Sequence, residues 1–366
     1  MSKRSTFIID SKFSPEELCL IECLFREKET VTESIDEKKL LDTATKNGLS
    51  QLLFKNDFSK KLSDEARKQL KDEYYFNLGK NAAFQLIASE ITQLLNEKNI
   101  PVIFLKGISL ISEVYKDIAL RPMSDIDIMT PSQFVYEAWQ TINPNAIEMK
   151  RNDVLTGHHL PGFNYRGINI ELHRSLLPID LKYQIPAKEV LNNLKRLEDF
   201  NALTLNPLHQ IIYLILHIYY TYIQGGLRLG WFYDLKALHH KYEDQITLEN
   251  VEKLANYLKI HKPVRKMLAF FTVLFPESRL SINLSKKDKK EALKMIKMLQ
   301  SSDSMKMEYS YGYAWERFSQ TKGLKNKCLF LFNALLDDGK GKQKFSFKRV
   351  MILIKNTLKF LWRRFF

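Results

Sequence analysis

Apolar residues recur every three or four positions through the first hundred residues, which is the period of an amphipathic helix. Ser14 and Pro15 precede "EELCLIECLF", "IDEKKLLDTATKNG" ends at Gly48, and a longer pattern runs from about residue 63 to 98. Serine favours the N-cap, proline the first helical position and glycine the C-terminal end. We therefore expect an N-terminal helical region over residues 1–78, whose last helix continues into the next region.

The pattern changes to short apolar runs between residues 79 and 184. "PVIFL" and "SDIDIM" have the length and β-branched content of strands, and each is followed by a helical stretch. "HHLPGFNYRGINIELHRSL" predicts two further strands joined at Arg166 and Gly167. This alternation predicts a small mixed β-sheet core.

A helical period returns after residue 185, in "PLHQIIYLILHIYYTY", "WFYDLKALHHKY" and "LENVEKLANYLKI". The longest apolar run, residues 211–220, is too short to span a bilayer and contains His217, so we expect a buried helix there. The predicted fold class is α+β: a mixed-sheet core over 79–184, the N-terminal helical region over 1–78, a helical domain over 185–338 and a basic amphipathic tail over 339–366.

The composition is that of a soluble globular protein, with 366 residues, 45% hydrophobic and 27% charged. Three cysteines, Cys19, Cys23 and Cys328, support neither a zinc site nor a disulfide framework. The N-terminus lacks the apolar stretch of a secretory signal, which predicts a cytoplasmic protein.

The net charge of +14 favours anionic partners, but much of it belongs to the tail, since residues 340–366 contain nine basic residues and no acid. Within 344–366 the apolar residues fall at steps of three and four, with lysines off that face. This pattern is typical of a cationic helix at a membrane surface. A helix that packs on protein has the same pattern, so peripheral contact with the inner face of the membrane is one of two expectations.

The strongest chemical signal is "SDIDIM". In a strand Asp125 and Asp127 point to the same face, where two like charges repel each other unless a cation compensates them. A bound metal ion is one interpretation, and a solvated edge strand is the other. Glu171 and His173 share one face of the later strand "INIELH" in the same way.

A strand-to-helix turn precedes these acids and contains Lys106, Gly107 and Ser109. Glycine lets the backbone approach a ligand, and amides at a helix start favour an anion. Arg121 lies four residues before the first aspartate, where it is expected over the site or paired with Asp117 or Asp125.

Phosphoryl and nucleotidyl transfer need these components together: carboxylates that hold Mg²⁺ (or Mn²⁺), a turn that cradles phosphates, and an in-line nucleophile. The order "LKGISL", "RPMSDIDIM", "INIELH" resembles the polymerase beta-like nucleotidyltransferase superfamily and, within it, the bacterial uncharacterised nucleotidyltransferase family over roughly residues 35–245. The residues in matching order are Tyr115, Arg121, Asp125, Asp127, Glu171, His173, His217, Arg228 and Asp234.

The resemblance implies roles for individual residues. Asp125 and Asp127 would bind metal, Glu171 would be the third acid, and Gly107 and Ser109 would hold the triphosphate. The glycine and serine are separated here by one residue, and the third acid is glutamate where aspartate is commoner.

Other polar residues have open interpretations. His217 is expected in the core, and His158 and His159 either contact substrate or are exposed in a loop. Arg228 is expected to bind phosphate over the cleft or to form a salt bridge with Asp234.

The leading expectation is a nucleotidyltransferase that moves an NMP from an NTP to an acceptor hydroxyl or phosphate; a sugar, a lipid-linked molecule and a peptide are the candidate acceptors. The expected substrate-binding residues are Lys106, Gly107, Ser109, Arg121, His173 and Arg228. One alternative is an inactive nucleotide- or peptide-binding module whose tail docks a partner or membrane. A nucleic-acid-binding protein is less favoured, because no aromatic and basic platform is present in the core.

Overall fold

The computed structural model describes residues 9–28, 35–143, 158–300, 317–328 and 330. The tail predicted over 339–366, with its expected membrane contact at 344–366, lies outside them. Among the described residues, no helix combines the length and the apolar composition that crossing a bilayer requires.

The N-terminal helices confirm the boundaries that their capping residues predict. They are α2 (Pro15–Leu20), which continues as a π-helix over Ile21–Phe25, α3 (Glu37–Asn47), α4 (Ser50–Lys55) and α5 (Asp64–Asn96). Ser14 and Glu17 form a capping box, in which each side chain binds the backbone N–H of the other residue. Gly48 ends α3 with φ of +68°, a left-handed conformation that glycine adopts without strain.

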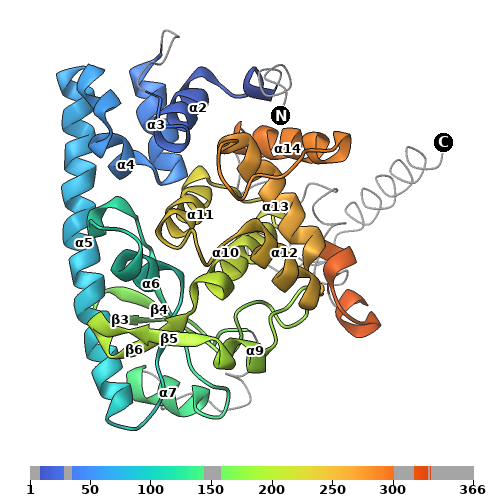
Figure 1. The fold of residues 1–366 in the computed structure, drawn as a ribbon. Helices are drawn as coiled ribbons and strands as arrows, with labels where there is room; N and C mark the ends of the chain where they lie inside the picture. Colours follow the sequence, from blue (N-terminus) through green and yellow to red (C-terminus); the bar gives the residue numbers. More distant parts are fainter. Residues whose placement is uncertain (1–8, 29–34, 144–157, 301–316, 329, 331–366) are drawn as a thin grey trace, which may run out of the picture.

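One mixed six-stranded sheet lies beside the lower half of α5 (Figure 1). Its strands are β1 (Ile103–Phe104), β2 (Asp125–Met129), β3 (Phe163–Tyr165), β4 (Ile168–His173), β5 (Leu194–Leu197) and β6 (Ala202–Leu205), in the order β3-β4-β2-β1-β6-β5. The parallel pairs are β2–β4 and β1–β6. Arg166 and Gly167 have positive φ and turn β3 into β4, as predicted from the sequence.

Strands β5 and β6 were not expected. They pair with each other, and β6 pairs with β1 through Ile103 and Leu203. The sheet therefore extends past residue 184, and the expected boundary between the core and the helical domain does not coincide with the end of the sheet.

The remaining helices cover the sheet and extend away from it. Those inserted between strands are α6 (Lys106–Glu113), α7 (Val135–Ile142) and α9 (Ala187–Asn192). Those after the sheet are α10 (Pro207–Tyr222), α11 (Leu229–Lys241), α12 (Leu248–Tyr257), α13 (His261–Leu274) and α14 (Lys286–Gln300).

Two hydrophobic clusters divide the interior. The smaller one joins α5, α6 and α7 to one face of the sheet, and it includes Ile126, Ile128, Ile170 and Leu172. The larger one joins the N-terminal helices to α10–α14. The N-terminal helical region therefore shares its core with the helices after the sheet. This assembly places α10 and α11 opposite the polar face of the sheet.

Candidate nucleotidyltransferase site

The acids of β2 and β4 occupy the polar face of the sheet because the alternating residues of both strands are apolar. Ile126 and Ile128 are completely buried on the other side, which turns Asp125 and Asp127 toward the helical region. In the parallel pairing of the two strands, Asp127 lies directly opposite Glu171. The register therefore brings the predicted third acid next to the aspartate pair.

Asp127 is the most enclosed of the acids on β2 and β4, with 4% of its surface exposed. Its Oδ1 atom accepts hydrogen bonds from Lys106 Nζ at 3.1 Å and from His173 Nε2 at 2.8 Å. Glu171 Oε2 lies 3.7 Å from the same His173 nitrogen. Both of these side-chain hydrogen bonds go to Oδ1 of Asp127.

Charge is unevenly compensated within this group. Burial disfavours the ionised form of Asp127, but Lys106 and His173 outweigh this effect and hold its pKa well below the usual range. Burial also disfavours the Lys106 ammonium, yet Asp127 raises the pKa of Lys106. For Asp125, burial and the charge of Asp127 raise the pKa. Asp125 is therefore less well compensated by the protein's own cations than Asp127.

A cavity of about 420 Å³ opens against Asp125 and Asp127. The sheet side contributes the turn at Lys106 and Gly107 and residues 121–125. Helices α10 and α11 contribute the opposite wall, with Leu214, His217, Ile218, Thr221, Arg228, Trp231 and Asp234. The acids therefore lie at an interface between the sheet and the helical region, which is a common position for a ligand site.

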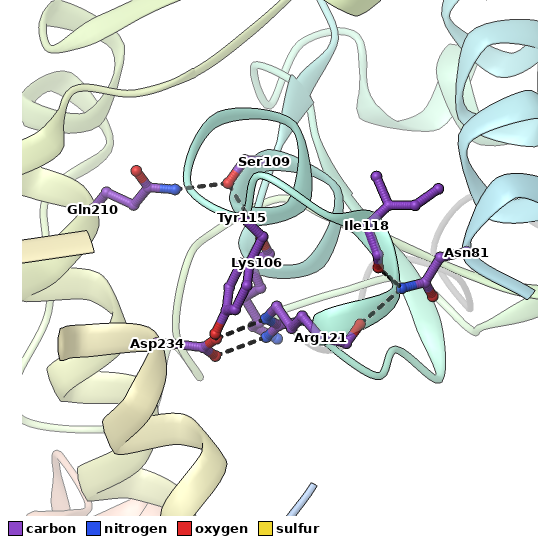
Figure 2. A network of polar contacts seen from close by, with 8 residues as sticks. All are labelled: Asn81, Lys106, Ser109, Tyr115, Ile118, Arg121, Gln210 and Asp234. Carbon is purple, nitrogen blue, oxygen red and sulfur yellow. Dashed lines mark hydrogen bonds and ion pairs between the residues drawn. The ribbon is translucent and has the colours of Figure 1, made fainter. Parts of the chain in front are cut away.

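Two arginines reach this cavity in different ways. Arg121 is partly buried and forms a bidentate ion pair with Asp234, through Nε at 2.9 Å and Nη2 at 3.0 Å (Figure 2). Arg228 is exposed, and its guanidinium lies 5.6 Å from the centre of the Trp231 ring. Asp234 is thus paired with Arg121 and not with Arg228, and neither Asp117 nor Asp125 is the partner of Arg121.

The turn that precedes α6 brings backbone close to the cavity. Lys106 has φ of +42°, an unfavourable conformation for a lysine that directs the chain into the helix. A Cβ atom on Gly107 would lie 2.6 Å from Met123 Sδ, so only glycine fits without a shift of Met123.

Ser109 does not line the cavity. Its hydroxyl is completely buried, donates to the Lys106 carbonyl oxygen and accepts a hydrogen bond from Gln210 Nε2 at 2.7 Å. In this structure Ser109 therefore joins α6 to α10 and does not face a ligand, unlike Gly107.

Histidines surround the acids on one side. The rings of His158 and His159 each lie 5.6 Å from the ring of His173. Burial, with the neighbouring histidines, lowers the pKa of His158 to about 3, so this ring is neutral at physiological pH. His217, expected in the core, is half-buried and lines the cavity beside Trp231.

The donor set fits a divalent cation. Ligand atoms of Asp127, Glu171 and His173 lie within 4.8 Å of one another, and Asp125 follows on the same face of β2. Carboxylate oxygens suit Mg²⁺ and Mn²⁺, and an imidazole nitrogen is a better ligand for Mn²⁺ than for Mg²⁺. The burial of Asp125 and the charge of Asp127 beside it favour a bound cation.

Two aspartates of one strand and a glycine turn line one cavity, and an acid on the adjacent parallel strand lies opposite Asp127; these features match those by which the sequence resembles nucleotidyltransferases. The family model "Uncharacterised nucleotidyltransferase" matches residues 33–276. The chain therefore belongs to this family, as the resemblance in its motifs predicted. No curated protein and no solved structure matches the chain significantly.

Several residues of the site were not singled out as functional by sequence reasoning. Trp231 and Thr221 lie on helices whose apolar pattern gave no sign of a cavity. Asn81, in the middle of α5, donates hydrogen bonds from Nδ2 to the carbonyl oxygens of Ile118 and Arg121, at 2.5 and 2.8 Å. Asparagine is a poor residue for a helix interior, and this was the available signal.

Proposed function

We propose that this protein is a Mg²⁺-dependent nucleotidyltransferase, also active with Mn²⁺, that transfers an NMP from an NTP to an acceptor hydroxyl or phosphate and releases pyrophosphate. The observation that carries the proposal is the register of β2 and β4, which sets Asp127 opposite Glu171 beside a cavity with basic walls. The family match supports the reaction class.

Each residue has a role in this proposal. Asp125, Asp127 and Glu171 hold the metal, with His173 as a further ligand or as the donor that orients Asp127. A divalent cation bound there would neutralise the triphosphate and lower the charge barrier to attack by the acceptor oxygen. Glu171 alternatively takes the proton of the acceptor hydroxyl. Lys106, Gly107, Arg121 and Arg228 bind the phosphates.

The bonds that change are the same for any acceptor. The acceptor oxygen attacks the α-phosphorus in line with the bond to the β-phosphate, and this bond breaks as pyrophosphate leaves. The protein's contribution is to position these groups and to stabilise their charge. We assign the part of the opposite wall on α10 to acceptor selection, with a sugar, a lipid-linked molecule or a peptide as the candidate acceptors.

The test incubates the protein with each α-labelled NTP, Mg²⁺ or Mn²⁺ and a cell extract. Label should pass to an acceptor with the wild-type protein and with Asp72→Asn, an exposed acid on α5 that serves as the control. It should be lost with Asp125→Asn and with Asp127→Asn. Transfer that persists in both of the last two variants would contradict the proposal.

A second candidate is a module that binds a nucleotide or peptide without transferring it. This candidate is favoured because two side chains expected to bind phosphate already have partners within the protein. The Ser109 hydroxyl is buried and bound by Gln210, and the Lys106 ammonium binds Asp127. Metal-dependent NTP binding with no release of pyrophosphate would support this candidate over the first.

The proposal places the protein in the cytoplasm, where NTPs are present, with peripheral contact to the inner face of the membrane through residues 344–366. Liposomes rich in anionic lipid should then retain the full-length protein better than a chain that ends near Asp338. Equal retention would exclude the tail as a membrane anchor.

A further inference from the structure

Arg121 is fixed along one edge of its guanidinium. Nε and Nη2 donate to the two oxygens of Asp234, and Nη1 takes no part in this pair. Nη1 instead lies 3.5 Å from the position that a Cβ atom on Gly107 would occupy, beside the start of α6. The edge formed by Nη1 and the second Nη2 hydrogen is therefore left for another partner.

Both ends of this arginine are held by buried groups. Tyr115 donates its hydroxyl hydrogen to Asp234 Oδ1 at 2.6 Å, and Asp234 has 3% of its surface exposed. On the other side Asn81 donates to the Arg121 carbonyl oxygen at 2.8 Å. Asp234 of α11, itself bound by Tyr115 just after α6, thus fixes the guanidinium, and Asn81 of α5 fixes the backbone of Arg121 (Figure 2).

Arg121 lines the cavity that contains Asp125 and Asp127, together with Lys106 and Gly107, and its Nη1 atom lies beside Gly107. A planar guanidinium with one edge anchored by a carboxylate presents the other edge in a fixed orientation, which suits two oxygens of one phosphate. Fixing the side chain in advance also reduces the entropy that ligand binding would otherwise cost.

We propose that Asp234, supported by Tyr115, is a positioning residue that aims Arg121 at the phosphates that leave as pyrophosphate. This inference rests on the proposed function and deepens it, because it assigns the Arg121 side of the cavity to the β- and γ-phosphates. Since Asp234 belongs to α11, the phosphate site is complete only when the helical region is seated against the sheet.

The opposing interpretation is a clasp that holds the loop before β2 against α11 and has no part in binding. The two differ in a measurable way. A clasp contributes to folding stability alone, whereas a positioning residue also changes the affinity for phosphates in protein that is fully folded.

The experiment measures the affinity for inorganic tripolyphosphate with Mg²⁺ by calorimetry, at a temperature well below the unfolding midpoint of every variant. Arg121→Lys and Asp234→Asn should each weaken binding about tenfold or more, since each removes a charge-assisted hydrogen bond or the geometry for it. Asp234→Glu retains a carboxylate and should recover part of the affinity. Tyr115→Phe keeps the ion pair and should lose affinity by only a few-fold.

The matched control is Lys195→Met, which breaks a partly buried ion pair with Glu113 at the end of α6. It should lower the unfolding midpoint and leave tripolyphosphate affinity unchanged. The same pattern in Asp234→Asn would overturn the inference in favour of a clasp. If Asp234→Asn does not fold, Tyr115→Phe and Asp234→Glu provide the affinities, and wild-type values in both would overturn it equally.

The outcome is separable from that of the proposed function. Label transfer that depends on Asp127, with unchanged tripolyphosphate affinity in Asp234→Asn, removes this inference alone. Absence of transfer, with weaker tripolyphosphate binding in Asp234→Asn and Arg121→Lys, removes the enzymatic proposal and retains the phosphate site. A wild-type protein that does not bind tripolyphosphate overturns the inference.

Discussion

Asp127 and Glu171 lie directly opposite each other on parallel strands, although 43 positions separate them in the chain. Their carboxylates and His173 form a compact group that the sequence places on two unrelated stretches. This pairing is what converts two separate acidic motifs into one candidate metal site.

Metal binding is the most direct consequence of that pairing. Glu171→Gln should weaken Mn²⁺ binding about tenfold or more, since it removes a charged oxygen ligand while keeping the size of the side chain. Electron paramagnetic resonance of free Mn²⁺ during a titration measures the change. Asp72→Asn should bind Mn²⁺ as the wild type does, and equal binding by Glu171→Gln would remove this acid from the metal site.

The start of α6 leaves little room beside Gly107. Gly107→Ala should lower the free energy of unfolding by about 1–3 kcal/mol, because the new methyl group overlaps Met123 Sδ. The double variant Gly107→Ala, Met123→Ala should lack this overlap. It should therefore bind tripolyphosphate better than Gly107→Ala does, although the shorter side chain at position 123 causes a loss of its own. Urea unfolding and calorimetry of the single and double variants test this, and a double variant no better than Gly107→Ala would contradict the steric explanation.

Gly230 packs against the backbone of Asn47 and Gly48. A Cβ atom there would lie 2.6 Å from the Asn47 carbonyl oxygen, which cannot move aside like a flexible side chain. Gly230→Ala should therefore destabilise the protein by at least about 2–3 kcal/mol, the upper part of the range for overpacking, in urea unfolding.

Gly79 is the matched control for both glycine substitutions. It lies on an exposed part of α5, and its Cβ atom would have no neighbour within 4 Å. Gly79→Ala should stabilise the protein by about 0.5–1 kcal/mol, because alanine loses less conformational entropy in a helix. A loss of stability here that matches Gly230→Ala would show that contact with Asn47 is not the cause.

Asp288 provides a pH-dependent contribution to stability far from the site. Burial disfavours its ionised form, but hydrogen bonds from Arg265 and Ser285 outweigh this effect and lower the pKa of Asp288 below its ordinary value of 3.8. Because the lower pKa belongs to the folded state, the stabilisation is complete above the unfolded pKa and is lost as the pH falls through the folded value.

The corresponding measurement is urea unfolding of the wild type and Asp288→Asn between pH 7 and pH 3. The wild type should be the more stable protein at pH 7, and the difference should shrink below about pH 4, the ordinary pKa of aspartate. A difference that grows as the pH falls would mean that the sign of the pKa shift is wrong.

Sequence patterns predicted the local structure well where one signal was strong. Capping residues located the ends of α2 and α3, and the turn at Arg166 and Gly167 located the hairpin of β3 and β4. Strands β5 and β6 escaped prediction because "LKRL" and "ALTL" contain fewer β-branched residues than the runs at β1, β2 and β4.

The candidate site was also predictable only in part. Alternation along β2 is enough to predict that Asp125 and Asp127 lie on one face of that strand. Alternation along β4 predicts the same for Glu171 and His173. The partner of Arg121 was not predictable. Depending on the fold, Asp117, Asp125 or Asp234 could lie beside Arg121, and the sequence alone does not decide among them. The hydrogen bond from Gln210 to Ser109, the residue expected to hold the triphosphate, was not predictable either, because Gln210 comes from a distant helix.

The sequence by itself determined which residues can carry the chemistry and which face of its strand or helix each one occupies, because side-chain direction follows from local backbone geometry. The tertiary structure alone decided which of those faces meet. Strand register set Asp127 against Glu171, and the packing of α11 set Asp234 against Arg121. Such contacts depend on how distant apolar surfaces pack together, and no local pattern encodes that arrangement.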